Sequence, residues 1–265
     1  MKQTSLLAKL NIKHLYSEYV KSKIKFYHFM LNSAEIHNIR GHWIFVQDLN
    51  SNSIVIDLGA NKGGFSKLIQ EKFKSKCYAI EANKNLFDKI KTEIPLAFNY
   101  AISSFDGPLE FYISKNDEAS SIIRDFENEW GFETKIQVEG VTFKNLLKKL
   151  ELKNKEIEIV KVDIEGAELN FIESLTIEDV KNVKQISIEF HDWLNKSLHE
   201  RTINAIKKLE SLGFTSYGDY NIELLFINKK LVNLDSKKRI NLGLYKMLIS
   251  LNNQLSKFKG VKHIS

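Results

Sequence analysis

The 265-residue sequence predicts an α/β domain built around a largely parallel sheet. Two observations carry this prediction. Short apolar runs alternate with segments of helical periodicity through most of the chain, which is typical of βαβ units. Residues 54–66, IVIDLGANKGGFS, also place a β-branched strand, a glycine turn and the start of a helix in direct succession. Such a unit brings backbone N–H groups close to a ligand, so we expect a binding site here.

Length and composition fit one large domain with extensions at both ends, and we expect the limits 1–53, 54–228 and 229–265. Cys77 is the sole cysteine, and its apolar surroundings predict a buried thiol rather than a nucleophile. Lys9 and Lys13 interrupt the apolar core that a signal peptide would need. No apolar run approaches the ~18 residues of a membrane-spanning helix. We therefore expect a cytoplasmic protein.

The net charge of +6 is concentrated at the C-terminal end. Residues 229–265 contain nine lysines and arginines and one acid, Asp235, which leaves residues 1–228 with a net charge of −2. The basic termini suggest peripheral contact with a membrane surface or a phosphorylated substrate. A solvated, lysine-rich helix is the simpler interpretation.

Periodicity and turn signals predict the individual elements. Apolar residues at three- and four-residue steps indicate an amphipathic helix over 5–31, and a short strand or lid edge is expected within 38–50. We expect Thr142 to cap a helix that runs to Leu150, and Gly213 to end a helix over 197–212. The other expected elements are strands at 77–81, 97–102, 109–113, 136–141 (an edge strand), 157–162 and 185–190, helices at 83–93 and 167–175, a loop over 114–133, and a final hairpin of strands 215–220 and 223–227.

Residues 57–63 read D-x-G-x-N-x-G, which differs from a dinucleotide fingerprint. A G-x-G-x-x-G run that began at Gly59 would need glycine at position 61, where the chain has Asn61. Glu81 ends the next strand, at a distance along the chain where an acid can bind both hydroxyls of a ribose. Ile102 is placed to lie against a flat adenine. We therefore predict a cofactor site formed by Asp57, Gly59, Asn61, Gly63, Glu81, Ala101 and Ile102.

A second group of charged residues follows the strand at 157–162. Asp163, Glu165 and Glu168 would be electrostatically costly at the end of a buried strand unless something occupied the site. Glu168 also suits a helix N-terminus. One strand further on, Glu189 and His191 point to the same side of the chain. His191 is a candidate general base, or a metal ligand together with Asp163 or Glu189.

The segments VIDLGANKGGFS, AIEAN, NYAISSFDG, EASSI, VKVDIEGAE and ISIEFHD occur in the order and approximate spacing of the FkbM-type methyltransferases, and this resemblance covers roughly residues 54–217. The resemblance implies a class I methyltransferase (Rossmann-like) fold, with a mixed seven-stranded sheet, helices on both faces and an antiparallel strand from the final hairpin. It also implies S-adenosylmethionine as the methyl donor. Many relatives O-methylate hydroxyls of saccharides or natural products.

The mechanism that we expect is an in-line attack of an acceptor hydroxyl on the sulfonium methyl group. We assign removal of the hydroxyl proton to His191, with Asp163 orienting either His191 or the acceptor. The residues expected to contact the acceptor are Ser120, Ser121, Glu165 and Glu189. A divalent ion held by Asp163 with Glu189 or His191 is the competing account, and the predicted site itself includes no metal.

Three alternatives stay open. A nicotinamide-dependent dehydrogenase would use a similar fold, but Asn61 argues against it. A nucleic-acid methyltransferase would suit the basic tail, yet neither Pro95 nor Pro108 belongs to the [DN]-P-P-[YFW] signature of many base-amine methyltransferases, so nucleic acid is not the expected partner. A non-catalytic, membrane-associated adaptor on the same fold is disfavoured by the intact motifs.

Overall fold

The computed structural model describes residues 22, 25–114, 121–122, 132–192, 196–218 and 223–258. The chain forms two compact units, one of residues 38–233 and one that combines residues 1–37 with 234–265. Most of the helix expected over 5–31 and most of the loop expected over 114–133 lie outside the described residues. The domain limits expected at 53 and 228 stay predictions.

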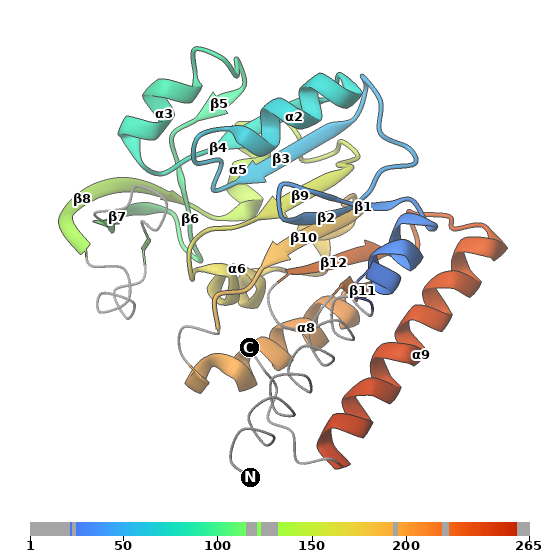
Figure 1. The fold of residues 1–265 in the computed structure, drawn as a ribbon. Helices are drawn as coiled ribbons and strands as arrows, with labels where there is room; N and C mark the ends of the chain where they lie inside the picture. The colour runs from blue at the N-terminus through green and yellow to red at the C-terminus, as the bar shows by residue number, and fades with distance from the viewer. Residues whose placement is uncertain are drawn as a thin grey trace, which may run out of the picture. The chain divides into compact units, whose positions relative to one another are not determined.

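A mixed seven-stranded sheet forms the centre of residues 38–233 (Figure 1). Its strands, in spatial order, are β11 (Phe214–Gly218), β12 (Glu223–Asn228), β10 (Gln185–Glu189), β9 (Ile159–Val162), β3 (Ile54–Leu58), β4 (Lys76–Ile80) and β5 (Ala97–Phe98). β12 runs antiparallel to both of its neighbours, and the other neighbouring strands are parallel. The final hairpin therefore supplies the antiparallel strand, as expected.

Helices cover both faces of this sheet because alternate residues of each strand point to opposite sides. On one face, Ile56 and Val160 belong to a core with α5 (Phe143–Lys149), α6 (Glu168–Ser174), α7 (Ile177–Val180) and α8 (His199–Ser211). On the other face, Val55 and Cys77 pack with α2 (Gly64–Phe73), and Ala79 packs with α3 (Lys84–Ile90). The thiol of Cys77 is buried, as the sequence predicts.

Local signals explain where several helices begin and end. The Thr142 hydroxyl accepts a hydrogen bond from the Asn145 N–H at 3.3 Å and caps α5. Gly213 follows α8 with a φ of 104°, in the left-handed region that favours glycine. A 3₁₀ turn, η2 (Lys196–Leu198), precedes α8, so the α-helix itself begins slightly later than expected.

A separate pair of strands precedes β3 in the chain. β1 (Ile36–Ile39) and β2 (His42–Phe45) form a two-stranded sheet, which confirms the short strand expected within 38–50. The Gln185 side chain donates to the Phe45 carbonyl and accepts from the Phe45 N–H, both at 2.8 Å. These two bonds fasten β2 to β10 and so fix the position of His42.

The strand expected over 97–102 is wrong as one continuous element. The chain leaves the main sheet at Asn99, whose side-chain amide donates to the carbonyls of Glu81 and Ala82 at 2.7 and 2.9 Å. β5 therefore ends at Phe98, and β6 (Ala101–Ile102) pairs with a different strand.

The expectation of an edge strand at 136–141 is also wrong. β8 (Phe132–Val141) is the middle strand of a three-stranded sheet, between β6 and β7 (Gly107–Ser114). Its alternating polar residues show that one face is solvated, but they carry no information about how many strands pair with it.

In the other compact unit, residues 25–32 are helical and α9 (Ser236–Phe258) is a long helix. The ring centroids of Tyr27 and Tyr245 lie 5.7 Å apart in an edge-on arrangement. The Asn241 amide donates to the Ser33 hydroxyl at 3.0 Å. Among the residues that the structure describes, no helix is both long and apolar enough to cross a membrane.

Candidate active site

The turn after β3 lies directly against the end of β9. Gly59 has a φ of 76°, and a Cβ built on it would lie 1.8 Å from the carbonyl oxygen of Asp163. The N–H groups of Gly59 and Ala60 both donate to the Ile80 carbonyl at 3.0 Å. Only glycine fits position 59, because its conformation and its space both exclude a side chain.

A buried lysine joins the two acidic motifs beneath this turn. Lys161 lies opposite Asp57 in the register of β9 and β3. Its ammonium group lies 3.2 Å from Asp57 Oδ1 and 3.3 Å from Asp163 Oδ2, and it donates to the Gly59 carbonyl at 2.8 Å. Burial works against ionisation of Asp163, but Lys161 and His42 hold the pKa of this carboxyl well below its usual range. Asp163 is therefore a carboxylate at neutral pH.

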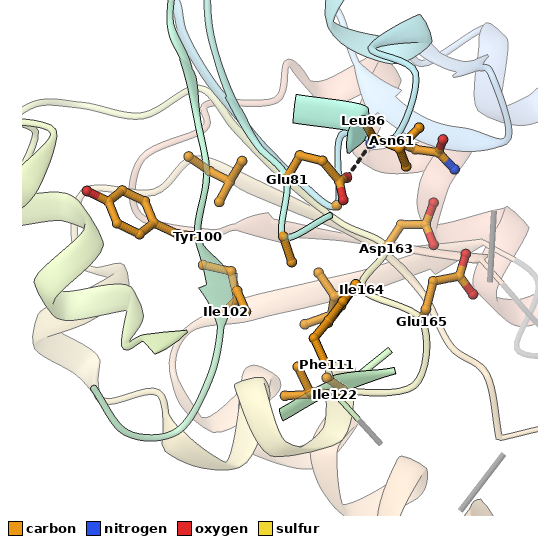
Figure 2. Close-up of a pocket in the computed structure, with 15 residues that line it drawn as sticks. Asn61, Glu81, Leu86, Tyr100, Ile102, Phe111, Ile122, Asp163, Ile164 and Glu165 are labelled. Atoms are coloured by element: carbon orange, nitrogen blue, oxygen red, sulfur yellow. Dashed lines mark hydrogen bonds between the residues drawn. The ribbon is translucent and has the colours of Figure 1, made fainter. Parts of the chain in front are cut away.

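The first of two adjoining cavities lies beside the turn, which contributes Asn61 to its lining (Figure 2). The turn residues Gly59 and Asn61 and the carboxylates of Glu81, Asp163 and Glu165 form its polar wall. Its apolar wall includes Ile80, Leu86, Tyr100, Ala101, Ile102, Phe111 and Ile122. A ligand with an apolar part and a polar part would fit such a lining.

Glu81 is positioned by the backbone on both sides of it. Its Oε2 accepts a hydrogen bond from the Asn61 N–H and its Oε1 accepts one from the Asn83 N–H, both at 2.7 Å. Burial raises the pKa of Glu81 to about 7, although the two N–H bonds favour the ionised form. Each carboxylate oxygen keeps a further lone pair for a hydroxyl of a ligand.

The second cavity is mostly polar and adjoins the first. It is lined by Arg40, His42, Ala60, Lys62, Gly64, Phe65 and Lys161, in addition to four residues that also line the first cavity: Gly59, Asn61, Asp163 and Glu165. The shared residues are contributed by the two motifs that follow β3 and β9. Two ligands, one in each cavity, would therefore meet beside Asp163 and Glu165.

His191 is held between two carboxylates, those of Glu165 and Glu168. Its Nε2 is 3.3 Å from Glu165 Oε2, and its Nδ1 is 3.2 Å from Glu168 Oε1. Glu168 also accepts hydrogen bonds from the N–H groups of Ile164 and Gly166 at the start of α6. Burial lowers the pKa of His191, but Glu168 and Glu165 outweigh burial and raise it to about 10. The imidazole is therefore protonated at neutral pH.

Burial raises the pKa of Glu165 to about 8, against the opposing effect of the His191 cation. The backbone of Glu165 is in the left-handed region, with a φ of 53°, which is uncommon for a residue other than glycine, asparagine or aspartate. Functional residues are often held in such strained conformations.

The family model described as the methyltransferase FkbM domain matches residues 57–216. The chain belongs to the FkbM methyltransferase family. Its mixed seven-stranded sheet with helices on both faces is the class I methyltransferase fold that the resemblance implied. No sequence among the curated proteins matches the chain.

Similar solved structures include a methyltransferase FkbM from Methylobacillus flagellatus KT, at 12% identity and a TM-score of 0.40, covering 73% of this chain and 47% of that chain. This chain thus spans about half the length of that protein. An rRNA methylase from Streptococcus thermophilus has 14% identity, a TM-score of 0.36, and coverage of 77% and 95%. TrmK from M. capricolum, in complex with S-adenosylhomocysteine, has 16% identity, a TM-score of 0.32, and coverage of 83% and 85%.

The structure of this FkbM-family chain brings most of the expected cofactor residues to one place. Gly59, Asn61, Glu81, Ala101 and Ile102 line the first cavity. Their role in binding a cofactor stays a prediction.

Asp57 and Gly63 are packed below the cavity walls. Asp57 is fully buried and accepts a hydrogen bond from the Ser66 hydroxyl at 2.7 Å. Gly63 precedes α2 with a φ of 72°, and a Cβ there would approach Ile94 Cδ1 to 2.7 Å. Both residues shape the turn without lining either cavity, and their role in binding a cofactor stays a prediction.

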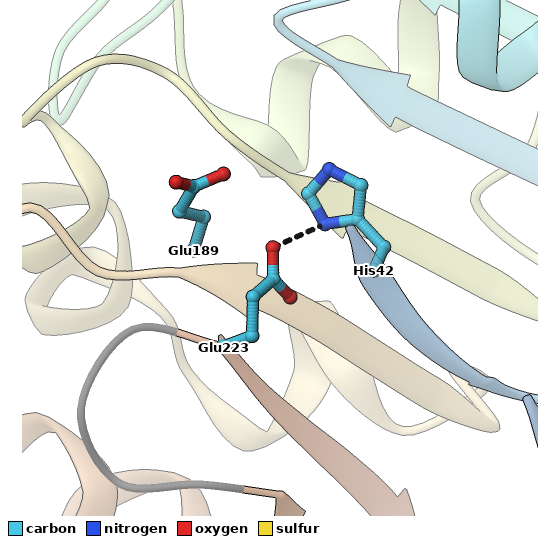
Figure 3. Close-up of side chains that lie close together, drawn as sticks. All are labelled: His42, Glu189 and Glu223. Carbon is cyan, nitrogen blue, oxygen red and sulfur yellow. Dashed lines mark ion pairs between the residues drawn. The ribbon is translucent and has the colours of Figure 1, made fainter. Parts of the chain in front are cut away.

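Only some of the residues expected to contact the acceptor or to catalyse the reaction line the cavities. Asp163 and Glu165 line both cavities, and His191 contacts Glu165. The Ser121 hydroxyl donates to the Glu165 carbonyl, so it supports that loop. Ser120 lies outside the described residues. Glu189 lies near His42 and Glu223 at the end of β10 (Figure 3).

Sequence reasoning missed several residues of the site, above all Lys161 and His42. A lysine within the apolar strand Ile159–Val162 was a usable signal, because a buried charge needs a partner. His42 gave no comparable signal, since it precedes the matched region and lies on β2, which Gln185 joins to β10.

Proposed function

We propose that this FkbM-family protein is an S-adenosylmethionine-dependent methyltransferase that methylates a hydroxyl group of a saccharide or another small, hydroxyl-rich molecule. The observation that carries the proposal is the pair of adjoining cavities that share Gly59, Asn61, Asp163 and Glu165. A methyl donor in the first cavity and an acceptor in the second would have their reacting atoms side by side.

The first cavity fits S-adenosylmethionine in its chemistry. The Glu81 carboxylate can accept hydrogen bonds from the two ribose hydroxyls, and Leu86 and Ile102 provide apolar surface for an adenine. The bound cofactor would supply a methyl group on a sulfonium, which is already an activated electrophile. The protein must then exclude water, align the acceptor and receive one proton.

The shared wall can perform the last two tasks. Asp163, held ionised by Lys161, would accept a hydrogen bond from the acceptor hydroxyl and orient it. Transfer of the sulfonium methyl group to the hydroxyl oxygen would release the hydroxyl proton, which must pass to a base. We propose Glu165 for this role, because it lines both cavities and has a pKa of about 8.

This proposal revises the role expected for His191. An imidazole with a pKa of about 10 carries a proton at neutral pH and must lose it before it can act as a base. His191 also lines neither of the two cavities, whereas Glu165 lines both. We therefore propose that His191 is a positioning residue that holds Glu165.

The polar lining of the second cavity supports an acceptor with many hydroxyls. Arg40 and Lys62 donate hydrogen bonds, whereas Asp163 and Glu165 accept them, and a saccharide uses both kinds. This lining of mixed donors and acceptors differs from the exposed strip of cations and aromatic rings that is typical of single-stranded nucleic-acid sites. A saccharide is thus the acceptor class that the cavity favours.

Calorimetric titration tests the cofactor directly. We expect S-adenosylmethionine and S-adenosylhomocysteine to bind and NADH not to bind. Glu81→Gln keeps the size of the side chain but removes its charge, so it should weaken binding of both sulfur compounds by about tenfold or more. Glu93→Gln, which changes an exposed carboxylate paired with Lys67, should bind as the wild type does. NADH binding, or equal affinity of Glu81→Gln and the wild type, would refute the cofactor assignment.

The acceptor class needs a separate test. Methyl transfer from radiolabelled S-adenosylmethionine should label a component of a saccharide panel and leave RNA unlabelled. Labelled RNA would overturn the saccharide proposal and leave the cofactor assignment intact.

A further inference from the structure

A second group of charged side chains adjoins the second cavity without a role in the proposed reaction. His42 of β2, Glu189 of β10 and Glu223 of β12 each offer one ligand atom, and these atoms lie within 4.8 Å of one another (Figure 3). The Nδ1 of His42 is 3.1 Å from Glu223 Oε1, and its Nε2 is 3.7 Å from Asp163 Oδ2. All three side chains extend from strands: β2, β10 and β12.

Polar atoms of His42 and Glu223 in this group are buried and poorly satisfied. The His42 side chain is only 4% exposed. Among the described residues, neither its Nδ1 nor either carboxylate oxygen of Glu223 has a hydrogen-bond partner. The contact between Nδ1 and Glu223 is therefore an ion pair without hydrogen-bond geometry. Such buried, unsatisfied atoms are rare in folded proteins and call for an explanation.

The carboxylates add a second anomaly. Glu189 and Glu223 are direct cross-strand partners in the antiparallel pair of β10 and β12. Like charges in this position repel each other and destabilise a sheet. Asp163 adds further negative charge on the other side of His42. A bound cation would satisfy the orphaned atoms and relieve this repulsion together.

We propose that His42, Glu189 and Glu223 bind a divalent transition-metal ion. One imidazole nitrogen and two carboxylate oxygens are a ligand set typical of Mn²⁺, Fe²⁺ or Zn²⁺, and they leave coordination positions open.

A competing group of Asp163, Glu165 and His191 also has ligand atoms within 4.8 Å of one another. In that group His191 Nδ1 is within hydrogen-bond distance of Glu168, and none of its three residues has a buried polar side-chain atom without a hydrogen-bond partner. The orphaned atoms of His42 and Glu223 therefore favour the first group.

The position of the site suggests its use. An ion at His42 would lie at the wall of the second cavity, which His42 and Asp163 both line, and could bind a hydroxyl of the acceptor. This use rests on the proposed function, whereas binding of the ion does not.

The test is a titration of chelator-treated protein with Mn²⁺ in the absence of any methyl donor. Binding is monitored as the loss of the free-ion signal in electron paramagnetic resonance. We expect one Mn²⁺ per chain. Glu223→Gln, Glu189→Gln and His42→Gln should each weaken binding by about tenfold or more. Glu165→Gln and His191→Gln change the competing group and serve as matched controls that should keep wild-type affinity.

Pulsed resonance supplies a readout that does not depend on how a variant folds. Wild-type protein with bound Mn²⁺ should show coupling to a histidine nitrogen. The proposal is overturned if Mn²⁺ does not bind, if the bound ion shows no nitrogen coupling, or if the control substitutions abolish binding while Glu223→Gln keeps it. Because no step uses S-adenosylmethionine, failure of this test and failure of the proposed function remain distinguishable.

Discussion

The carbonyl oxygen of Asp163 occupies the space that a side chain at Gly59 would need, 1.8 Å from the ideal Cβ position. The turn after β3 and the loop after β9 are thus in backbone contact. These two segments also supply the residues shared by the two cavities. A change in either segment should therefore disturb both halves of the site.

Gly59→Ala tests this contact. The added methyl group cannot avoid a backbone oxygen, and alanine at a φ of 76° is strained, so we expect a clear loss of thermal stability together with loss of cofactor binding. Gly243→Ala is the matched control. It lies in α9 with open space around it, and should raise stability by about 0.5–1 kcal/mol. A Gly59→Ala protein that melts and binds like the wild type would contradict the contact.

Lys161→Met should destabilise the protein strongly. Removal of this buried cation leaves Asp57 and Asp163 without their shared partner, and breaking a buried ion pair costs about 3–5 kcal/mol. Denaturant unfolding measures the change. Lys181→Met removes an exposed ion pair with Glu178 and should change stability by less than about 1 kcal/mol. Equal, small effects of the two substitutions would show that Lys161 does not hold the motifs together.

The glycine turn, Glu81 and Asp163 could be predicted because each belongs to a short pattern at a strand end, and parallel strands bring their carboxyl ends to one edge of a sheet. That rule accounts for Gly59 and Glu81 lining one cavity, whereas Ile102 lines it from β6, outside the main sheet. The same rule predicted Glu189 and His191 beside Asp163; His191 lies in one group with Asp163, whereas Glu189 lies with His42 and Glu223.

The parts that sequence reasoning missed depend on contacts between distant segments. His42 reaches the site through the hydrogen bonds between Phe45 and Gln185, which are 140 residues apart. The chain leaves the main sheet at Asn99, whose side chain donates to the Glu81 carbonyl, and β6 then pairs with β8. Neither contact leaves a periodic pattern, so the local sequence could not show it.

The pH dependence of methyl transfer distinguishes the two candidate bases. A glutamate must be ionised, and a histidine must be neutral, before it can accept a proton. In either case the rate rises as the pH passes the pKa of the base. With Glu165 as the base, kcat/KM should rise to half its maximum near pH 8, and with His191 near pH 10. The measurement is made with a chelator present, so that no bound ion alters either group.

Two substitutions complete this test. Glu165→Gln should lower kcat by about 10²–10⁴-fold and remove the rise near pH 8. His191→Gln removes a cation that favours the Glu165 carboxylate, so the rise should move to higher pH while activity persists. A rise that disappears with His191→Gln and survives Glu165→Gln would restore His191 as the base.

Contact with a membrane surface stays a prediction for the basic C-terminal extension. The long helix α9 is the part of this extension that would make the contact. Ser236–Phe258 contains no acidic residue. Large apolar side chains recur on its exposed surface at helical spacing: Ile240, Leu244 and Met247. An amphipathic basic helix of this kind binds anionic lipid through both its charge and its apolar face.

We therefore expect the full-length protein to sediment with vesicles that contain phosphatidylserine and to stay in solution with neutral vesicles. Lys237→Glu combined with Lys246→Glu should reduce sedimentation, because each basic residue near the surface contributes about 1 kcal/mol. Leu244→Ser should reduce it at any salt concentration, whereas the effect of the charge reversals should fade as salt rises. Lys181→Glu, a charge reversal elsewhere on the surface, is the control. Sedimentation that is equal for all these proteins would mean that α9 does not bind lipid.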